Sequence, residues 1–320
     1  MRKLLLGTTA LAAAATLSAN AIADISISGY YEWKYQSRSS NITTNDGTTF
    51  ANDSEIVFKF SNKTDSGLDI SLTTDLEADD TDTAINESSM TIAGGFGKLV
   101  LGGNDSVGDD YGIEEGDIVS EEILATGVDS LTLLDADIAG MEGDANKVSY
   151  HLPAMGGLTA GVSFADSGAA GASDTTTYGA QYAMSAGGAS ITLGGATATT
   201  ENSTQDIDSQ NMGMKVVTGN VSVIISQGKY EASSTDETGT GASISFKVND
   251  AMSVGAFTVE VEDDTSSEEY TNTGAEVQYS IASGLTAYLN VEDYDYKVGT
   301  SSSTTADSGT VSKLTIKATF

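Results

Sequence analysis

The feature that most constrains this chain is a period-two alternation of apolar and polar residues, repeated along nearly its whole length in segments of roughly ten residues. In Ile25–Tyr35 the odd positions are mostly apolar or aromatic, whereas the even positions are mostly polar. Successive side chains of a β-strand point to opposite faces, so each segment predicts a strand with one apolar and one polar face. The last segment, Thr310–Phe320, repeats the pattern and ends on an aromatic residue.

The connections between these segments are of two kinds that alternate along the chain. Short turns are expected at 63–67, 94–97, 153–157, 186–188, 218–220, 249–251 and 282–284. Longer connections, acidic and rich in Ser and Thr, are expected at 37–52, 78–86, 104–146, 166–174, 200–209, 231–239, 262–268 and 296–309. Short turns on one rim and long loops on the other, with about sixteen strands, predict an all-β fold: a sixteen-stranded antiparallel transmembrane β-barrel. A soluble sandwich would show no such difference between rims.

Composition limits the class of protein further. The chain has 46 Asp and Glu against 14 Lys and Arg, a formal charge of −32, and only 39% hydrophobic residues. The low apolar content leaves a secreted soluble β protein or a barrel with a polar interior. The absence of cysteine excludes disulfides and thiolate metal sites. A nucleic-acid partner is not expected, because binding nucleic acid requires a basic face.

The first 23 residues are typical of a secretory signal peptide. A positive start at Arg2 and Lys3 precedes the apolar run Leu4–Leu17, and Ala21–Ala23 fits a cleavage site with small residues. The mature chain is then 24–320, with a charge of about −34. No later stretch approaches the ~20 apolar residues of a transmembrane helix, so a mature protein in a membrane must be a barrel.

One long segment, Asn104–Asn146, does not alternate. It is rich in Asp and Glu and has no Lys or Arg, yet it carries apolar residues such as Ile118, Leu131 and Leu133. Loops of this length are uncommon unless they are functional or disordered, and disordered acidic tracts are poor in apolar residues. We therefore predict that this segment folds back into the structure and packs there.

Several segments resemble general Gram-negative porins, most nearly the alphaproteobacterial type. They are the signal peptide, the opening Ile25–Tyr30, the segment Ser88–Gly102 before the acidic loop, and the closing Leu314–Phe320. The resemblance covers the whole mature chain and implies a homotrimer of sixteen-stranded barrels in outer-membrane lipid. It also implies a third outer loop that folds into the lumen and narrows it, a position that Asn104–Asn146 matches. The terminal Phe320 matches the residue that the outer-membrane insertion machinery reads in this family.

The expected function is passive diffusion of small hydrophilic solutes and ions through a water-filled channel, because a barrel of this size leaves an aqueous bore. Selectivity then comes from the bore and from the charges at its narrowest zone. The resemblance implies acidic loop residues opposed to basic residues on the facing wall. The acidic candidates are Asp109, Asp110, Glu114, Glu115 and Asp117, and the basic candidates are Lys34, Lys59, Lys313 and Lys317.

The charge of the chain and its acidic long-loop rim predict a preference for cations, because low-dielectric walls focus the field in the channel. The carboxylates leave Ca²⁺ binding as one hypothesis and ordinary surface charge as the other. No enzyme activity is expected, since the lone His151 lies on the polar face of a strand without a nucleophile motif. The alternative function is a secreted acidic adhesin or surface-layer protein, which would dissolve without detergent.

Aromatic residues towards the strand ends predict girdles at the two lipid–water boundaries, where Tyr and Trp are favoured. These residues are Tyr31, Trp33, Tyr35, Tyr178, Tyr182, Tyr294, Tyr296 and Phe320.

Overall fold

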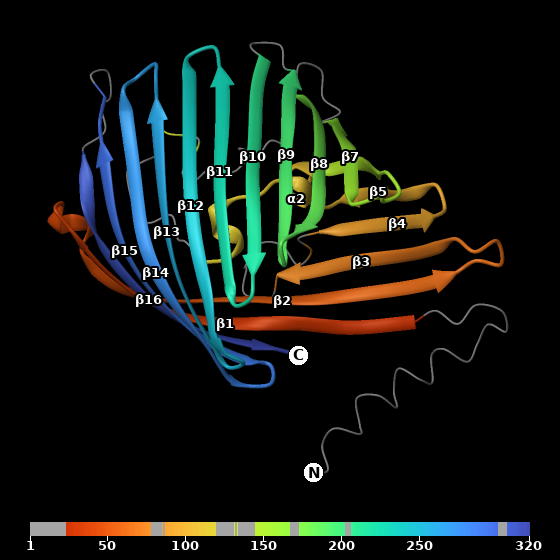
Figure 1. Ribbon diagram of the computed structural model, residues 1–320, viewed down its shortest axis with the longest axis horizontal. Helices are drawn as coiled ribbons and strands as arrows, with labels where there is room; N and C mark the ends of the chain where they lie inside the picture. Colours follow the sequence, from red (N-terminus) through yellow and green to blue (C-terminus); the bar gives the residue numbers. More distant parts are fainter. Residues whose placement is uncertain are drawn as a thin grey trace.

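The chain forms one closed barrel of sixteen antiparallel strands in which every strand pairs with its neighbours in sequence (Figure 1). The computed structural model describes residues 24–77, 85, 87–119, 131, 133, 145–166, 173–201, 206–299 and 306–320, so the expected signal peptide lies outside the described residues. The first eight strands are β1 Asp24–Ser40, β2 Gly47–Lys63, β3 Asp69–Glu77, β4 Ser88–Gly94, β5 Gly97–Gly103, β6 Asn146–His151, β7 Leu158–Asp166 and β8 Asp174–Ala186. The others are β9 Ala189–Glu201, β10 Asp206–Thr218, β11 Val221–Ala232, β12 Thr235–Asn249, β13 Met252–Asp263, β14 Glu268–Ala282, β15 Leu285–Lys297 and β16 Asp307–Thr319. The predicted sixteen-stranded barrel is therefore confirmed.

The barrel closes where the first strand pairs with the last. The β1–β16 register runs from Tyr30 opposite Thr319 to Ser40 opposite Gly309. Phe320 follows the end of β16 and extends this pairing, since its N–H donates to the carbonyl of Gly29 at 3.1 Å and its carbonyl accepts from the Gly29 N–H at 2.9 Å. A closed ladder leaves no strand edge unpaired, which a chain surrounded by lipid requires.

The two faces of the strands follow the alternation in the sequence. On β1, Ile27, Tyr31 and Trp33 are exposed on the outer face, and Tyr178 and Tyr182 of β8 are exposed in the same way. The prediction of outward-facing aromatic residues is wrong for Tyr294 and Tyr296 of β15, which are fully buried inside the barrel. Both are even-numbered residues on a strand whose outer face carries odd-numbered residues. The alternation along β15 therefore places them on the inner face, although their residue type suggests a girdle.

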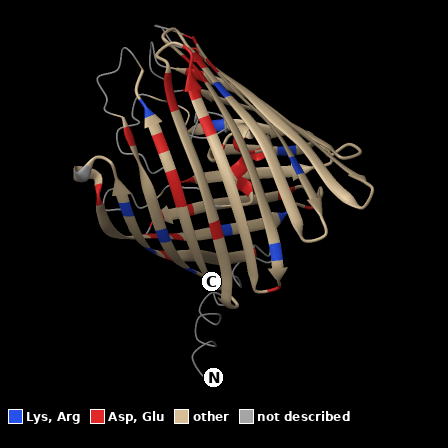
Figure 2. Ribbon diagram, turned by 60° about the vertical axis from the view of Figure 1, so that its left-hand side comes forward, with Lys and Arg blue, Asp and Glu red and all other residues tan. Residues whose placement is uncertain are grey.

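Several strands extend into segments expected to be loops. The expected loop 37–52 is mostly strand, because β1 continues to Ser40 and β2 begins at Gly47. Where these strands continue beyond the apolar band, many side chains are polar on both faces. The alternation of apolar and polar residues therefore does not identify these extensions as strand. Figure 2 shows that acidic residues gather towards this end of the barrel.

The interior holds a hydrophobic cluster towards the long-loop end. Leu131 and Leu133 of the acidic segment pack against inward-facing side chains of four consecutive strands, namely Val259, Val261, Tyr270, Tyr294, Tyr296 and Val311. This packing explains why β13 is apolar on its outer face at one end and on its inner face at the other. The register irregularities beside β13 and β15 lie near the short turns, between Lys247 and Asn249 and between Ser280 and Ala282.

Three short helical segments are described: the α-helix α2, Val107–Tyr111, and the 3-10 helices η2, Thr43–Asn45, and η3, Glu115–Asp117. Within the described part of the chain, no helix has the length and apolar character to cross a membrane.

Candidate pore constriction

The acidic segment enters the barrel through a capped helix. The hydroxyl of Ser106 accepts from the N–H of Gly108 at 2.9 Å, and the carboxylate of Asp109 accepts from the N–H of Ser106 at 3.0 Å. This reciprocal pair satisfies N–H groups that the first turn of a helix leaves without partners. The first acidic candidate, Asp109, therefore also fixes the direction in which the segment leaves β5.

Small residues on the inner wall make a shallow seat for residues 107–119. A Cβ atom at Gly179 of β8 would lie 2.5 Å from the carbonyl oxygen of Val107, and one at Gly194 of β9 would lie 2.6 Å from that of Tyr111. Inward-facing glycines of four more strands also lie directly under this segment, namely Gly161, Gly213, Gly241 and Gly255. The segment can lie this close to the wall only because these positions have no side chain.

The pairing register makes the seat continuous. Gly194 of β9 lies opposite Gly213 of β10, Gly213 lies opposite Ser226 of β11, and Ser226 lies opposite Gly241 of β12. Four neighbouring strands thus present three glycines and one serine in a single row. We call residues 107–119 the docked loop and this row, extended by Gly161, Gly179 and Gly255, the glycine seat.

Polar wall side chains form hydrogen bonds with backbone groups of the docked loop and of Leu133. Asn211 of β10 acts in both directions on Ile113, because its carbonyl oxygen accepts from the Ile113 N–H at 3.0 Å and its amide donates to the Ile113 carbonyl at 3.2 Å. Ser243 donates to the carbonyl of Glu115 at 2.7 Å, and Glu237 accepts from the N–H of Leu133 at 2.7 Å. Buried backbone groups need such partners, so the wall specifies the path of the loop as well as its depth.

Glu115 anchors the docked loop to the wall instead of facing the lumen. Its side chain is 0% exposed, and one carboxylate oxygen accepts from the hydroxyl of Ser226 at 2.6 Å, directly over Gly241. The other acidic candidates differ in exposure: Asp109, Asp110 and Asp117 are exposed and Glu114 is partly exposed. Four of the five acidic candidates therefore present surface to the interior of the barrel.

The single histidine also holds the docked loop. His151 of β6 is buried, and its Nδ1 lies 2.8 Å from the hydroxyl of Tyr111. Its Nε2 lies 3.6 Å from a carboxylate oxygen of Asp110. The sequence places His151 on the polar face, as the structure does, but gives no sign that its partner is 40 residues away in the docked loop.

Asp117 lies within the electrostatic reach of a basic residue of the wall. Desolvation by the surrounding protein raises the pKa of its carboxyl group, although the side chain keeps an exposed surface. The charge of Lys215 on β10 and a backbone hydrogen bond from Glu114 oppose this rise in pKa. Lys215 is thus a wall cation that acts on Asp117.

Three of the four basic candidates come together on the wall that the docked loop leaves uncovered. Lys34 of β1, Lys313 of β16 and Lys317 of β16 line one hollow of about 260 Å³. Lys59 of β2 lies apart from them, in a hollow of about 400 Å³ near the short turn between β2 and β3.

Two lysines of this wall, Lys34 and Lys317, are already paired with carboxylates. Glu32 lies 3.1 Å from the ammonium of Lys34 and 2.6 Å from that of Lys317, while Asp53 lies 3.2 Å from that of Lys34. The uncovered wall is therefore an alternating array of charges instead of a purely basic patch.

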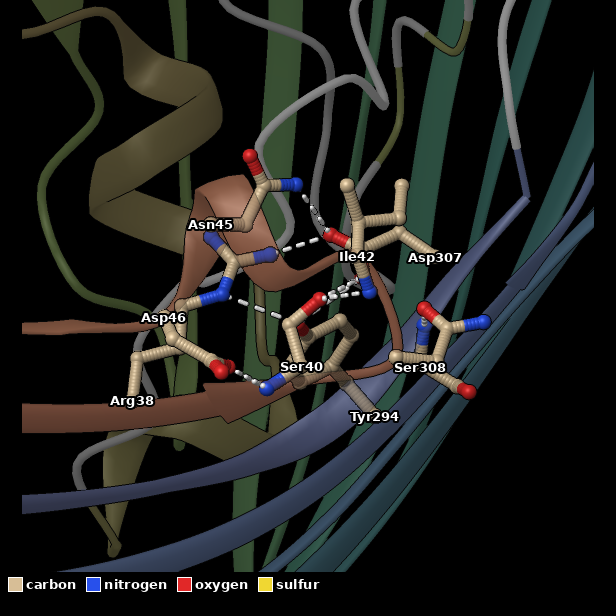
Figure 3. A network of polar contacts seen from close by, with 9 residues as sticks. Arg38, Ser40, Ile42, Asn45, Asp46, Tyr294, Asp307 and Ser308 are labelled. Carbon is tan, nitrogen blue, oxygen red and sulfur yellow. Dashed lines mark hydrogen bonds and ion pairs between the residues drawn. The ribbon is translucent and has the colours of Figure 1, made fainter.

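A second polar network fixes the seam of the barrel near the long-loop rim (Figure 3). Asp307 of β16 is fully buried and forms an ion pair with Arg38 of β1. It also accepts from the hydroxyl of Ser40 at 2.5 Å and from the amide of Asn45 at 3.1 Å. The guanidinium of Arg38 donates to the hydroxyl of Tyr294 at 2.8 Å and stacks over its ring. This network could not be predicted from the sequence, because its members are far apart in the chain.

No metal site is evident in the described residues: none of their His, Asp and Glu side chains form a group of three or more placed to hold an ion. The Ca²⁺ hypothesis therefore has no set of ligands in this part of the chain.

The fold and the docked loop together define a class: an outer-membrane β-barrel whose interior is narrowed by a segment packed on its inner wall. Residues 7–299 match the family model described as Gram-negative porin, and the chain belongs to that family. No curated protein matches it in sequence.

Solved structures show the same fold at low sequence identity. The chain is similar to an anion-selective porin from Comamonas acidovorans, with 16% identity, a TM-score of 0.64, and coverage of 93% of this chain and 100% of that one. It is also similar to a loop L8 deletion mutant of OmpT, an outer membrane protein of Vibrio cholerae, with 15% identity, a TM-score of 0.68, and coverage of 93% and 99%. The trimer form of in-vitro folded OmpT gives 14% identity, a TM-score of 0.67, and coverage of 93% and 99%. The protein is accordingly placed in the cell outer membrane, and its family and fold indicate a channel rather than an enzyme or a secreted protein.

Proposed function

We propose that this porin is a water-filled channel through which small hydrophilic solutes and ions diffuse passively, with a preference for cations. The observation that carries the proposal is the placement of the docked loop. It covers the inner wall from β7 to β13 and presents Asp109, Asp110 and Asp117 on its exposed side. Permeating ions pass between these carboxylates and the facing wall that carries Glu32, Lys34 and Lys317.

The charges of the uncovered wall support the cation preference. Glu32 and Asp53 offset much of the positive charge of Lys34 and Lys317, because the groups lie within 3.2 Å of one another. On the loop side, the exposed carboxylates of Asp109, Asp110 and Asp117 face the bore, and Lys215 is a wall cation that acts on Asp117. The field across the bore is then dominated by the acidic side, which raises the local concentration of cations.

The assembly that we propose is a homotrimer inserted by the outer-membrane insertion machinery. A related fold, OmpT of Vibrio cholerae, has a trimer form. Phe320 is exposed, although its backbone is paired with Gly29, and its side chain is therefore accessible for recognition during insertion. The resemblance to the alphaproteobacterial type stays a prediction.

Reversal potentials across a planar bilayer under a KCl gradient test the selectivity. The wild-type channel is expected to favour K⁺ over Cl⁻, and the variant Asp109→Asn/Asp110→Asn/Asp117→Asn is expected to lose most of that preference. Glu260→Asn is a matched control, because this exposed residue of β13 lies on the outer face of the barrel. A wild-type channel that favours Cl⁻ would refute the cation preference and leave the channel itself intact.

A further inference from the structure

A hollow on the outer face of the barrel lies at the long-loop end, where β1, β15 and β16 meet. Its volume is about 470 Å³. Its outward-facing lining residues are all polar: Ser39, Asn41, Asp293, Asp295, Ser308 and Thr310. A water molecule takes up ~30 Å³ of liquid, so the hollow has room for ~15 water-sized groups, enough for one hexose ring.

The hollow begins where the outer face of the wall changes from apolar to polar. The register gives three successive outward rows across β1, β16 and β15, namely Tyr35–Leu314–Leu289, Ser37–Ser312–Val291 and Ser39–Thr310–Asp293. Consecutive outward residues of a strand lie ~7 Å apart, so the polar third row lies ~14 Å along the strands from the apolar first row. The hollow therefore lies beyond the hydrocarbon core, in the headgroup layer on the side of the long, extracellular loops.

The three strands differ in how far they project into the hollow. The middle strand, β16, carries the short side chain of Ser308, which lies opposite Asp295 of β15. A Cβ atom at Gly309 would collide with the carbonyl oxygen of Ser39, so β1 lies close against β16 on the other side. Asn41 follows β1 and extends this pairing, because its N–H donates to the carbonyl of Ser308 at 2.8 Å and its side-chain oxygen accepts from the Ser308 N–H at 3.0 Å.

The buried network at the seam holds the same strands from the inner side (Figure 3). Asp307 accepts from the hydroxyls of Ser40 at 2.5 Å and Tyr294 at 3.3 Å, and it forms an ion pair with Arg38. Successive residues of a strand point to opposite faces, so these inward contacts fix the backbone from which the hollow's side chains project. A site fixed in this way loses little conformational freedom when a ligand binds.

The lining favours a ligand with many hydroxyl groups. Its two carboxylates accept hydrogen bonds only, and its three hydroxyls both donate and accept. Within the described part of the chain, the side chains of Ser39, Asp293 and Thr310 form no hydrogen bond or ion pair with protein groups. The next outward residue of β15, Lys297, is paired with Glu269 at 2.5 Å.

Three classes of headgroup differ in how well they match this lining. A phosphate or carboxylate group is repelled by Asp293 and Asp295. An ammonium group would use these two carboxylates alone and leave the hydroxyls of the other strands without partners. A sugar ring uses all three strands, since its hydroxyls donate to the carboxylates in charge-assisted hydrogen bonds and also exchange hydrogen bonds with Ser39 and Thr310.

We propose that this hollow binds the uncharged sugar headgroup of a glycolipid in the outer leaflet, with sugar hydroxyls donating to Asp293 and accepting from Ser39 and Thr310. The acyl chains of the lipid then lie along the apolar rows, beside Tyr35 and Trp33 of β1. The inference goes beyond the channel function and does not depend on it, because it requires only the fold and the outer-membrane location.

The single tryptophan of the chain gives a local readout of the lipid on this face. Trp33 is 37% exposed on the outer face of β1, the strand that forms one side of the hollow. The mature protein is placed in phosphatidylcholine vesicles in which one lipid at a time carries brominated acyl chains, which quench tryptophan fluorescence on contact. The lipids compared are monoglucosyl diacylglycerol, phosphatidylethanolamine and phosphatidylcholine. The glucosyl lipid is expected to associate about tenfold more strongly than phosphatidylcholine, and phosphatidylethanolamine to show no such preference.

The variant Asp293→Ala/Thr310→Val removes the acid and the hydroxyl that lie opposite each other in one row of the hollow. It is expected to abolish the preference, a loss of about tenfold in the relative association constant of the glucosyl lipid. Glu260→Ala/Thr240→Val is the matched control, because it removes an exposed acid and threonine that lie opposite each other on β13 and β12 at the same rim. Ser312→Ala, one row below the hollow, is the local control. Neither control is expected to change the preference. If the double variant does not insert, Asp293→Asn keeps the size of the side chain and is expected to lower the preference in part.

Three results would overturn the inference. One is a glucosyl lipid that associates no more strongly than phosphatidylcholine or phosphatidylethanolamine. Another is a preference that is unchanged in the variants of the hollow. The third is weak quenching by every brominated lipid, since protein rather than lipid would then cover this face. K⁺ conductance of the same vesicles is measured separately, so the proposed channel stands or falls independently of these outcomes.

Discussion

The glycine seat allows a sharp test of how the docked loop sets the bore. A Cβ atom introduced by Gly194→Ala would lie 2.6 Å from the carbonyl oxygen of Tyr111 and 2.8 Å from Cγ1 of Ile113. Ordinary contacts of this kind are at least 3.4 Å, so the loop must move away from the wall by about 0.8 Å. The nearest obstacle is a backbone oxygen, which cannot turn aside as a side chain does.

The energetic effect follows from the same geometry. Overpacking of this kind lowers the free energy of unfolding by ~1–3 kcal/mol. Replacing Gly by Ala also restricts the unfolded chain, which raises the free energy of unfolding by ~0.4–1 kcal/mol. A net loss of about 1 kcal/mol is expected for Gly194→Ala. Gly179→Ala should act in the same way, because its Cβ would lie 2.5 Å from the carbonyl oxygen of Val107.

Conductance is the direct measurement. Movement of the docked loop away from β8 and β9 narrows the lumen, so the variants are expected to show lower single-channel conductance than wild type while the barrel remains folded. Gly95→Ala is the matched control, since an added Cβ there meets nothing within 4 Å. If Gly179→Ala/Gly194→Ala conducts and unfolds as wild type does, the seat does not set the position of the loop.

Three further predictions concern other parts of the site. Glu115→Ala removes the buried carboxylate that holds Ser226 and is expected to cost ~1–3 kcal/mol in urea unfolding and to increase current noise, whereas Glu262→Ala, at an exposed position of β13, should change stability by less than ~0.5 kcal/mol. The pKa of Asp117 is raised, so its carboxyl group takes up a proton at a higher pH than an ordinary carboxyl group. As the pH is lowered through that pKa, the cation preference measured by reversal potential should fall and the folded state should gain stability. The variant Asp117→Asn should reduce both responses. Arg38→Ala leaves Asp307 buried without its cation and is expected to cost ~3–5 kcal/mol, read as a lower urea midpoint of the barrel, with partial recovery when Asp307→Asn is added.

The sequence is sufficient to predict the barrel because lipid imposes one rule on every strand. Ile27 and Trp33 face outward for the same physical reason, and the same parity places Lys34 and Lys313 inside. Residue type misleads beyond the apolar band, where Tyr294 and Tyr296 resemble girdle residues but lie at inward positions and pack against Leu133. There the inner face also carries apolar side chains, so hydrophobicity no longer indicates which face of the strand points outward.

The place where the loop docks on the wall could not be predicted from the sequence, because it depends on the pairing register of the strands. Gly194 and Gly213 become neighbours only when β9 and β10 are paired residue by residue, and an isolated glycine in a strand has several meanings. One signal was present: glycines recur at inward positions of β7–β10, β12 and β13, where a channel lining has no evident need of them. Residue type alone also does not predict which acidic side chains face the lumen, since Glu114 is partly exposed and its neighbour Glu115 is fully buried.

The total charge of the chain is therefore a poor guide to the field that an ion meets in the bore. Much of the acidic surplus lies towards the long-loop end of the barrel, where salt screens it over ~8 Å at physiological ionic strength (Figure 2). At the constriction, Glu32 offsets lysines on one side, while Asp109 and Asp110 are exposed on the other. The proposed preference for cations then depends on a difference of a few charges across the bore, and we expect a few substitutions on either wall to change it. We therefore propose that selectivity in this barrel is set by where the docked loop lies, because the glycine seat determines which part of the wall the loop covers.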